Sequence, residues 1–394
     1  MSAREPIYLC SPLRTPIGSF GGTLAGVPGP ELGAHVIRAV LEQSGADPAT
    51  IDEVIMGCIL TAGQGQAPAR QAVIKAGLPS TTQALTINKV CSSGLKAVML
   101  AADSVALGHS DAIIAGGFEN MSQSPYLLPA LRNGARLGHS SALDSMIVDG
   151  LWDPYNDYHM GNAAELCARE NKLTREAQDE FALQSYDRAL AAIEQGKFKN
   201  EIVPITVRTR KDEVEFAEDE EPKNLKRDKV SSLRPVFDKN GTVTAANAST
   251  INDGAAAMLV CSKSYADKHG IKPIATLISQ GWHGQAPEWF TTAPVGAMEM
   301  ALKKAGKDIA DIDLFEINEA FSAVALACGN KLSVDPNKLN IHGGAVALGH
   351  PLGASGARIL TTLLHALNQT GGRVGAAAIC NGGGEATSVV VEMV

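Results

Sequence analysis

A cysteine lies where a turn of small residues leads into a helical pattern. Cys91 is followed by Ser92, Ser93 and Gly94, and then by the apolar helical pattern LKAVMLAADSVALG. The positive end of a helix favours an anion and can lower the pKa of a thiol below about 8.5, which yields the nucleophilic thiolate. The small residues would leave the sulfur accessible to a substrate. From its location alone, Cys91 fits a nucleophile and a buried core thiol equally well.

Two more reactive side chains lie in glycine-rich segments later in the chain. His350 stands between Gly349 and Pro351 at the entrance of a second helical pattern. A Cys–His pair is the basic unit of thiol catalysis, whereas a turn histidine with a satisfied ring is the structural alternative. Cys380 ends the apolar strand pattern AAAIC, and three glycines follow Asn381. Their backbone N–H groups could face a ligand.

A polar pair interrupts the apolar run FEINEAFSAV. Asn318 and Glu319 occupy this place, which suits either a helix cap or a site. The glycine-rich turns contain neither G-K-[ST] nor G-x-G-x-x-G, so the nucleotide-binding motifs fail. Each of these signals is weak when it is taken singly.

Short strand patterns alternate with longer helical patterns, which indicates an α/β protein with helices covering a central sheet. We predict strands near residue 7, over 53–60 and over 111–119, and a helix over 31–45. The segment from Ser93–Gly94 through DAIIAGG echoes the segment from Ser355–Gly356 through GAAAICNGGG. Such an echo suggests two equivalent halves. If they pack about a pseudo-twofold axis, the matching turns would face each other.

The middle of the chain has a different character. Residues 121–249 are rich in turn residues and poor in buried-strand patterns, and we interpret them as a loop-rich insertion. Within it, Thr174 is a predicted N-cap of a helix that ends at Gly196. A hairpin turning at 210–213 and a mixed-charge segment follow.

Composition excludes several classes of function. The formal net charge of -8 opposes general nucleic-acid binding, and no apolar run is long enough for a membrane span. The seven cysteines include no C-x-x-C pair and have no zinc-site spacing, so we expect free thiols and no metal. Neither a secretory signal nor a peroxisomal address is recognisable, so we expect a cytoplasmic protein.

The motifs together resemble the thiolase family. They are, in chain order, VCSSGLKA, YHMG, NASTINDGAA, INEAFS, GGAVALGHPLGASGAR and CNGGG, and the resemblance covers essentially the whole chain. It implies a thiolase fold with two related five-layered α/β/α/β/α halves. The expected boundaries are 1–270 for the N-terminal half, with the loop domain at about 121–249 inserted, and 271–394 for the C-terminal half. His159 and Met160 resemble the short-chain biosynthetic branch, and the family is usually tetrameric.

The resemblance also implies roles for individual residues. Cys91 would attack acetyl-CoA and carry the acetyl group, and His350 would take its proton. Cys380 would remove the α-proton of a second acetyl-CoA, so that acetoacetyl-CoA and CoA form. The N–H groups of Cys91 and Gly382 would form one oxyanion hole, and His350 with a water held by Asn318 would stabilise the enolate oxygen.

The family pattern further implies a path for the CoA thioester, and no separate cofactor. The residues that match it are Leu151, His159, Met160, Lys223, Phe237, Ala245, Ser249, Ala320 and Phe321. Lys223 departs from the pattern, because many relatives carry arginine there and lysine lacks the bidentate fork. Pro222 replaces a tyrosine of the potassium-activated relatives.

Four other interpretations remain. A degradative 3-ketoacyl-CoA thiolase would act on longer chains. A ketoacyl-synthase-like enzyme would use one cysteine with two basic partners, which Cys380 disfavours. A non-catalytic thiolase-like binding protein would have lost Cys91, His350 or Cys380, and none is lost. A redox-sensing thiol would need a resolving cysteine, and none is near Cys91 in sequence.

Overall fold

The computed structural model describes residues 5–208 and 212–394. In those ranges ten strands form one sheet, in which nine follow the order β14-β15-β16-β13-β1-β12-β5-β3-β4 and β2 pairs with β12 off this path. The two parts of the chain meet where β1 pairs with β13 through Tyr8–Thr276 and Leu9–Ala275. The strands are β1 (Ile7–Arg14), β2 (Gly18–Ser19), β3 (Glu53–Gly57), β4 (Gln83–Ile87), β5 (Ala112–Asn120), β12 (Asn252–Ser262), β13 (Ala275–Gly284), β14 (Leu314–Ile317), β15 (Val374–Asn381) and β16 (Glu385–Met393).

Each half contains parallel strands that are joined by a crossover helix. Strands β4 and β5 both run parallel to β3, and α3 (Ser93–Ala106) connects β4 to β5. Strands β14 and β15 are parallel neighbours, and α10 (Leu352–Thr370) lies between them in sequence. Parallel neighbours require such a crossover. Helices α3 and α10 therefore hold equivalent places, as the sequence echo predicted.

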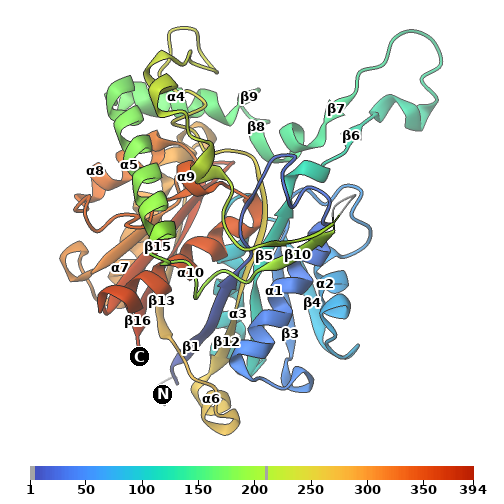
Figure 1. Cartoon of the computed structure of the whole chain (residues 1–394), viewed down its shortest axis with the longest axis vertical. Helices are drawn as coiled ribbons and strands as arrows, with labels where there is room; N and C mark the ends of the chain where they lie inside the picture. The colour runs from blue at the N-terminus through green and yellow to red at the C-terminus, as the bar shows by residue number, and fades with distance from the viewer. Residues whose placement is uncertain (1–4, 209–211) are drawn as a thin grey trace.

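Helices cover both faces of both half-sheets, which produces five layers (Figure 1). The outer layers are α1 (Gly29–Ser44) with α2 (Pro68–Ala76) on the N-terminal half, and α7 (Ala293–Ala305) with α8 (Ser322–Leu332) on the C-terminal half. The central layer is α3 and α10, whose apolar side chains pack between the two half-sheets in one cluster. The predicted α/β/α/β/α fold is confirmed. The two halves together form its five layers, because they share the central layer of helices.

The two central helices touch through glycines. A Cβ added at Gly94 would lie 2.8 Å from the backbone nitrogen of Ala357, and one at Gly356 would lie 2.3 Å from that of Leu95. The two Ser–Gly turns therefore face each other, as predicted. The start of the second helix differs from the prediction. Helix α10 begins at Leu352, so Ser355–Gly356 lies within its first turn and does not precede it.

The region predicted as an insertion contains both helices and short hairpins. Helix α5 (Arg175–Glu194) begins as predicted, since the Thr174 hydroxyl accepts the N–H of Ala177 at 3.1 Å, and it ends just before Gly196. The predicted hairpin forms from β10 (Ile205–Arg208) and β11 (Glu213–Phe216), although part of its turn lies outside the described residues. Further elements of this region are α4 (Met160–Glu170), β6 (Tyr126–Leu127), β7 (Leu143–Asp144), β8 (Trp152–Asp153) and β9 (Tyr158–His159). Outside it lie the short helices α6 (Lys263–His269) and α9 (Ala345–Leu348). The β6–β7 hairpin extends away from the body (Figure 1).

One predicted strand is shorter than expected. We predicted a strand over 53–60, but β3 ends at Gly57. The cause is a long-range contact, because the backbone N–H groups of Ile59 and Leu60 donate to the carboxylate of Glu119 instead of to a neighbouring strand. Among the described helices, none combines the length and apolar character that crossing a bilayer requires.

Candidate active site

A cavity of about 300 Å³ opens where the central helices meet the inserted region. Its wall brings together Cys91, His350 and Gly382, which lie far apart in sequence. Seven residues of the expected thioester path line the same cavity: Leu151, His159, Met160, Phe237, Ser249, Ala320 and Phe321. The rest of the wall is formed by Met121, Gly150, Val236, Ala248, Thr250, Ile251, Phe290 and Leu352.

Cys91 lies on a strained turn between β4 and α3. Val90, immediately before it, has a φ of 46°, a conformation that is unfavourable for a β-branched residue and that often marks a functional site. The cysteine is partly buried. Burial raises the pKa of Cys91 to about 12, against the favourable N–H groups of Cys91 and Gly382. The expectation that the helix terminus lowers this pKa is therefore wrong for the ligand-free site, since desolvation outweighs it.

The N–H groups of Cys91 and Gly382 act on the same sulfur. Gly382 follows β15 in the turn where Gly383 and Gly384 have φ values of 89° and 83°, which glycine tolerates well. The triple-glycine turn thus brings a backbone donor of the C-terminal half to a thiol of the N-terminal half. Two N–H groups that converge on one atom are the usual form of an oxyanion hole.

Hydrogen bonds on both sides hold His350 in place. Its backbone N–H donates to Oδ1 of Asn252 at 2.8 Å, and its Nδ1 lies 2.6 Å from Oγ of Ser355. Ser355 gives its single hydroxyl hydrogen to the carbonyl of Pro351 at 2.9 Å. This network assigns the hydrogen of the imidazole to Nδ1, which makes Nε2 the acceptor.

The imidazole of His350 is neutral and, within the part of the chain that the structure describes, has one unpaired ring nitrogen. Its Nε2 is buried and has no hydrogen-bond partner among the described residues. Burial, followed by the positive charge of Arg358, lowers the pKa of His350 to about 3. The ring is therefore neutral near pH 7 and carries a free lone pair in the wall of the cavity that holds Cys91.

Cys380 lies at the end of β15, where it pairs with Ala386 of β16. Cys380 is not among the described residues that line the cavity. Its side chain is 1% exposed and packs in a cluster with Met160, Ala320 and Phe321 of the cavity wall. Burial, and next the neighbouring Cys91, raises the pKa of Cys380 well above its ordinary value. Once deprotonated, this thiol would be a strong base.

The two polar residues of the INEAFS motif have separate roles. Glu319 accepts hydrogen bonds from the Ser185 hydroxyl at 2.7 Å, the Asn340 amide at 2.8 Å and the Val346 N–H at 3.1 Å, so it is a structural residue. Asn318 is 1% exposed, and neither its Oδ1 nor its Nδ2 has a partner in the part of the chain that the structure describes. A buried amide with four unused hydrogen-bonding positions suits a water or a substrate oxygen.

Two of the expected path residues lie apart from the others. Among the described residues, the cavity wall includes neither Lys223 nor Ala245. The Lys223 side chain is 62% exposed, forms an ion pair with Glu218, and lines a separate surface depression with Ser19 and Gly22. Ala245 is exposed. The assignment of Lys223 to the phosphates of CoA therefore stays a prediction.

Sequence reasoning did not single out three residues that support the site. Asn252 and Ser355 both lie inside motifs quoted for the family, so their positions were visible but their contacts to His350 were not. Glu119 ends the predicted strand DAIIAGGFE and is completely buried. Its charge at the end of an apolar strand pattern, two residues after Gly117, was the signal that the sequence offered.

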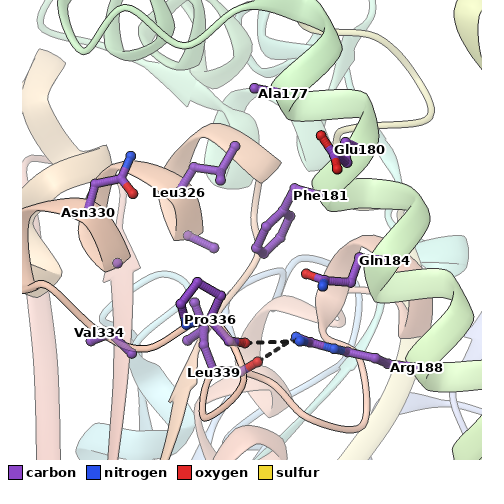
Figure 2. Close-up of a pocket in the computed structure, with 12 residues that line it drawn as sticks. Ala177, Glu180, Phe181, Gln184, Arg188, Leu326, Asn330, Val334, Pro336 and Leu339 are labelled. Carbon is purple, nitrogen blue, oxygen red and sulfur yellow. Dashed lines mark hydrogen bonds between the residues drawn. The ribbon is translucent and has the colours of Figure 1, made fainter.

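A second cavity, of about 220 Å³, lies between α5 and α8 (Figure 2). Phe181 and Leu326 point into it from the two helices. Arg188 at its edge donates to the carbonyls of Leu339 at 2.7 Å and Pro336 at 2.9 Å, so this guanidinium is engaged in the fold. None of the residues predicted for the site lines this cavity.

Comparisons with known proteins agree with the fold. The sequence models of "Thiolase, N-terminal domain" and "Thiolase, C-terminal domain" match residues 7–264 and 271–393. The chain is 52% identical over 388 residues to an acetyl-CoA acetyltransferase of Cupriavidus necator, with 98% of this chain and 99% of the relative covered. It is 49% identical over 389 residues to an acetyl-CoA acetyltransferase of Pseudomonas aeruginosa, with 98% and 99% covered.

A solved structure is similarly close. The crystal structure of the Bacillus anthracis acetyl-CoA acetyltransferase superimposes with a TM-score of 0.97 at 39% identity, and each chain is covered completely. By its five-layered α/β fold and its relatives, the protein is an acyltransferase in class. The chain belongs to the thiolase family.

Proposed function

We propose that this chain catalyses the reversible condensation of two acetyl-CoA molecules to acetoacetyl-CoA and CoA, the acetyl-CoA C-acetyltransferase reaction. The observation that carries the proposal is the meeting of Cys91, the neutral Nε2 of His350 and the Gly382 N–H in one cavity. Relatives at about half identity bear the name of this activity.

The first half-reaction moves an acetyl group onto Cys91. The sulfur attacks the thioester carbonyl while its proton passes to Nε2 of His350, and the N–H groups of Cys91 and Gly382 stabilise the oxyanion. Collapse of the intermediate breaks the bond between the carbonyl carbon and the CoA sulfur. The imidazolium of His350 gives this proton to the departing CoA thiolate, which leaves acetyl-Cys91, a neutral imidazole and the Cys380 thiol.

The second half-reaction forms the carbon–carbon bond. Cys380 passes its proton to Nε2 of His350, and the resulting thiolate removes the α-proton of a second acetyl-CoA. The high pKa caused by burial makes this thiolate basic enough for the task. His350 and a water held by Asn318 stabilise the enolate oxygen. The carbanion attacks acetyl-Cys91, the released Cys91 thiolate takes the proton from His350, and every group returns to its initial state.

The shape of the cavity supports a short acyl group. Met160 and Phe321, both nearly buried, lie in its wall, and the His159 ring stacks on Phe237 at a centroid distance of 4.7 Å. A bulky wall of this kind would reject longer chains by overlap. This observation favours the short-chain reaction over the degradative alternative of broader chain length.

Three further expectations belong to the same proposal and rest on the resemblance to the family. They are CoA thioesters as the only small molecules required, assembly as a homotetramer, and a cytoplasmic location. Light scattering of the purified chain tests the tetramer, and fractionation of cells that express it tests the location.

Mapping of the acyl-enzyme tests the proposed function directly. The protein is incubated with acetyl-CoA, quenched in acid, digested and analysed by mass spectrometry. An acetyl group on the Cys91 peptide is expected, together with thiolysis of acetoacetyl-CoA by the same preparation. A label on Cys380 without one on Cys91 would refute the assigned roles.

A further inference from the structure

Glu119 is a buried carboxylate that joins three separate segments next to the catalytic cysteine. It is 0% exposed and lies at the end of β5. One oxygen, Oε2, accepts the N–H of Ile59 at 3.1 Å and that of Gly353 at 2.9 Å. The other, Oε1, accepts the N–H of Leu60 at 3.0 Å and faces the Cys58 thiol at 3.6 Å. All of its close partners are donors.

These contacts connect the two halves of the molecule. Gly353 lies in the first turn of α10, whereas Ile59 and Leu60 follow β3 in the N-terminal half. The junction is tight, because a Cβ at Gly353 would lie 2.8 Å from the carbonyl oxygens of Gly57 and Phe118. A negative charge at the N-terminal turn of a 19-residue helix is favourable as well.

The segment that Glu119 holds is the one that carries the catalytic histidine. His350 lies three residues before Gly353, and its backbone is anchored on the other side by Asn252 of β12. Leu352, between them, packs against Ile59 and Leu60 and lines the cavity that contains Cys91. A shift of Gly353 relative to the N-terminal half would therefore change where Nε2 of His350 points.

Burial raises the pKa of Glu119 to about 7, so the side chain carries its full negative charge only above that pH. This charge also acts on the thiol. It opposes ionisation of Cys91, in the same direction as burial. Removal of the charge alone would make the Cys91 thiolate easier to form. Removal of the hydrogen bonds would misplace the base that must take the Cys91 proton. These two consequences have opposite signs for thiol reactivity, so they are separable by experiment.

We propose that Glu119 is a positioning residue for catalysis, which fixes the His350 turn of the C-terminal half against the half that carries Cys91. It acts through His350 and does not touch the substrate. The inference rests on the proposed function for its kinetic consequence, while its structural core is the pairing of Cys91 with His350. A displacement of reacting groups by about 1 Å can reduce a rate roughly 100-fold.

A double-mutant cycle on thiol reactivity tests the inference. The variants are Glu119→Gln, His350→Gln and the combination. The readout is the rate of Cys91 alkylation by iodoacetamide at pH 8, above the pKa of Glu119, with the modified peptide identified by mass spectrometry. In the wild-type background, Glu119→Gln should slow alkylation, because His350 no longer accepts the proton. In the His350→Gln background the same change should cause no slowing, and loss of the charge should even accelerate alkylation. Equal slowing in both backgrounds would overturn the inference.

Steady-state kinetics supply the second readout. Glu119→Gln should reduce kcat for acetoacetyl-CoA thiolysis roughly 10- to 100-fold while KM changes less than about twofold, since the walls of the thioester path are elsewhere. Asp313→Asn is the matched control, because Asp313 also accepts two backbone N–H groups, from Arg373 and Val374, but at the far start of β15. A kcat loss no larger than that of the control, at equal thermal stability, contradicts the role.

The two proposals fail in different ways. Alkylation of Cys91 needs no thioester. A protein without thiolysis activity that shows the predicted non-additivity would therefore support the role of Glu119 and refute the assigned reaction. If Glu119→Gln does not yield soluble protein, Glu119→Asp supplies the same cycle, because it keeps the charge but cannot reach all three N–H groups. Additive effects in that cycle would also refute the inference.

Discussion

Ser92 donates its hydroxyl to the carbonyl oxygen of Ile379 over 3.1 Å, and the bond is buried. Ser92 directly follows one reactive thiol, Cys91, and Ile379 directly precedes the other, Cys380. A single hydrogen bond thus connects the start of α3 to the end of β15. It joins the two halves of the molecule next to both thiols. This bond accounts for a serine rather than an alanine at the start of the helix.

Replacement of Ser92 should therefore separate the two thiols. Ser92→Ala leaves the Ile379 carbonyl without its partner, which costs about 1–3 kcal/mol when the group is buried. We expect a lower free energy of unfolding in urea and a larger loss in condensation than in acetylation of Cys91. Ser104→Ala is the control, because Ser104 lies at the other end of α3 and its hydroxyl bonds to the hydroxyl of Ser110. Equal losses in both half-reactions would contradict the tie.

Cys380 should serve the α-carbon and not the acyl transfer. In Cys380→Ala the condensation of acetyl-CoA should collapse, while the Cys91 peptide should still gain an acetyl group in a single-turnover experiment. The physical reason is that Cys91 has its own base, His350, whereas the α-proton has no other acceptor in the proposed mechanism. A folded variant in which both half-reactions fail equally would show that the division of labour is wrong.

The depressed pKa of His350 has a consequence for stability. Its value of about 3 in the folded state lies below the ordinary value of about 6.5, so the unfolded chain binds this proton more readily. The free energy of unfolding should decrease as the pH falls from about 6.5 toward 3. His350→Gln removes this contribution, so the stability difference between wild type and variant should change across that range. Urea titrations at several pH values measure it, and a constant difference would refute the assignment.

Met160 should limit the length of the acyl chain. Wild-type activity should fall sharply beyond acetoacetyl-CoA, because a wall excludes every longer homologue by overlap. Met160→Ala should admit a slightly longer or α-methylated substrate, with some loss on the short one. Met298→Ala is the control, since Met298 is a fully buried methionine of α7 that lies outside the cavity wall. Wild-type cleavage of 3-ketodecanoyl-CoA as fast as acetoacetyl-CoA would support the degradative alternative.

The tautomer of His350 should depend on Ser355. In Ser355→Ala the Nδ1 hydrogen loses its acceptor, so the neutral ring is no longer fixed with Nε2 facing the cavity. We expect a reduced kcat with little change in KM, and an altered imidazole nitrogen signal by NMR. Ser355→Thr, which keeps the hydroxyl, should recover part of the rate. A Ser355→Ala variant with unchanged kcat and an unchanged imidazole signal would show that the ring is held by packing alone.

The sequence by itself determined the features that depend on neighbouring residues. The helix cap at Thr174, the small-residue turn before α3, the glycine turn after Cys380 and the repeated Ser–Gly units all follow from local backbone preferences, and each was found where predicted. The repeat also implied two facing halves, because each crossover helix must cover its own sheet. The combination of motifs then identified Cys91, His350 and Gly382 as residues of one site.

The tertiary structure alone decided the properties that arise from packing between distant segments. Glu119 meets Gly353 across 234 positions of sequence. The same carboxylate accepts the N–H groups of Ile59 and Leu60, which ends β3 earlier than its apolar pattern predicts. The pKa of Cys91 rises instead of falling because burial, which no local pattern measures, outweighs the helix terminus. The position of Lys223 away from the cavity likewise depends on tertiary structure, because it is set by how the inserted region folds over the two halves. Local sequence specifies conformation, whereas desolvation and long-range hydrogen bonds exist only once the chain has folded.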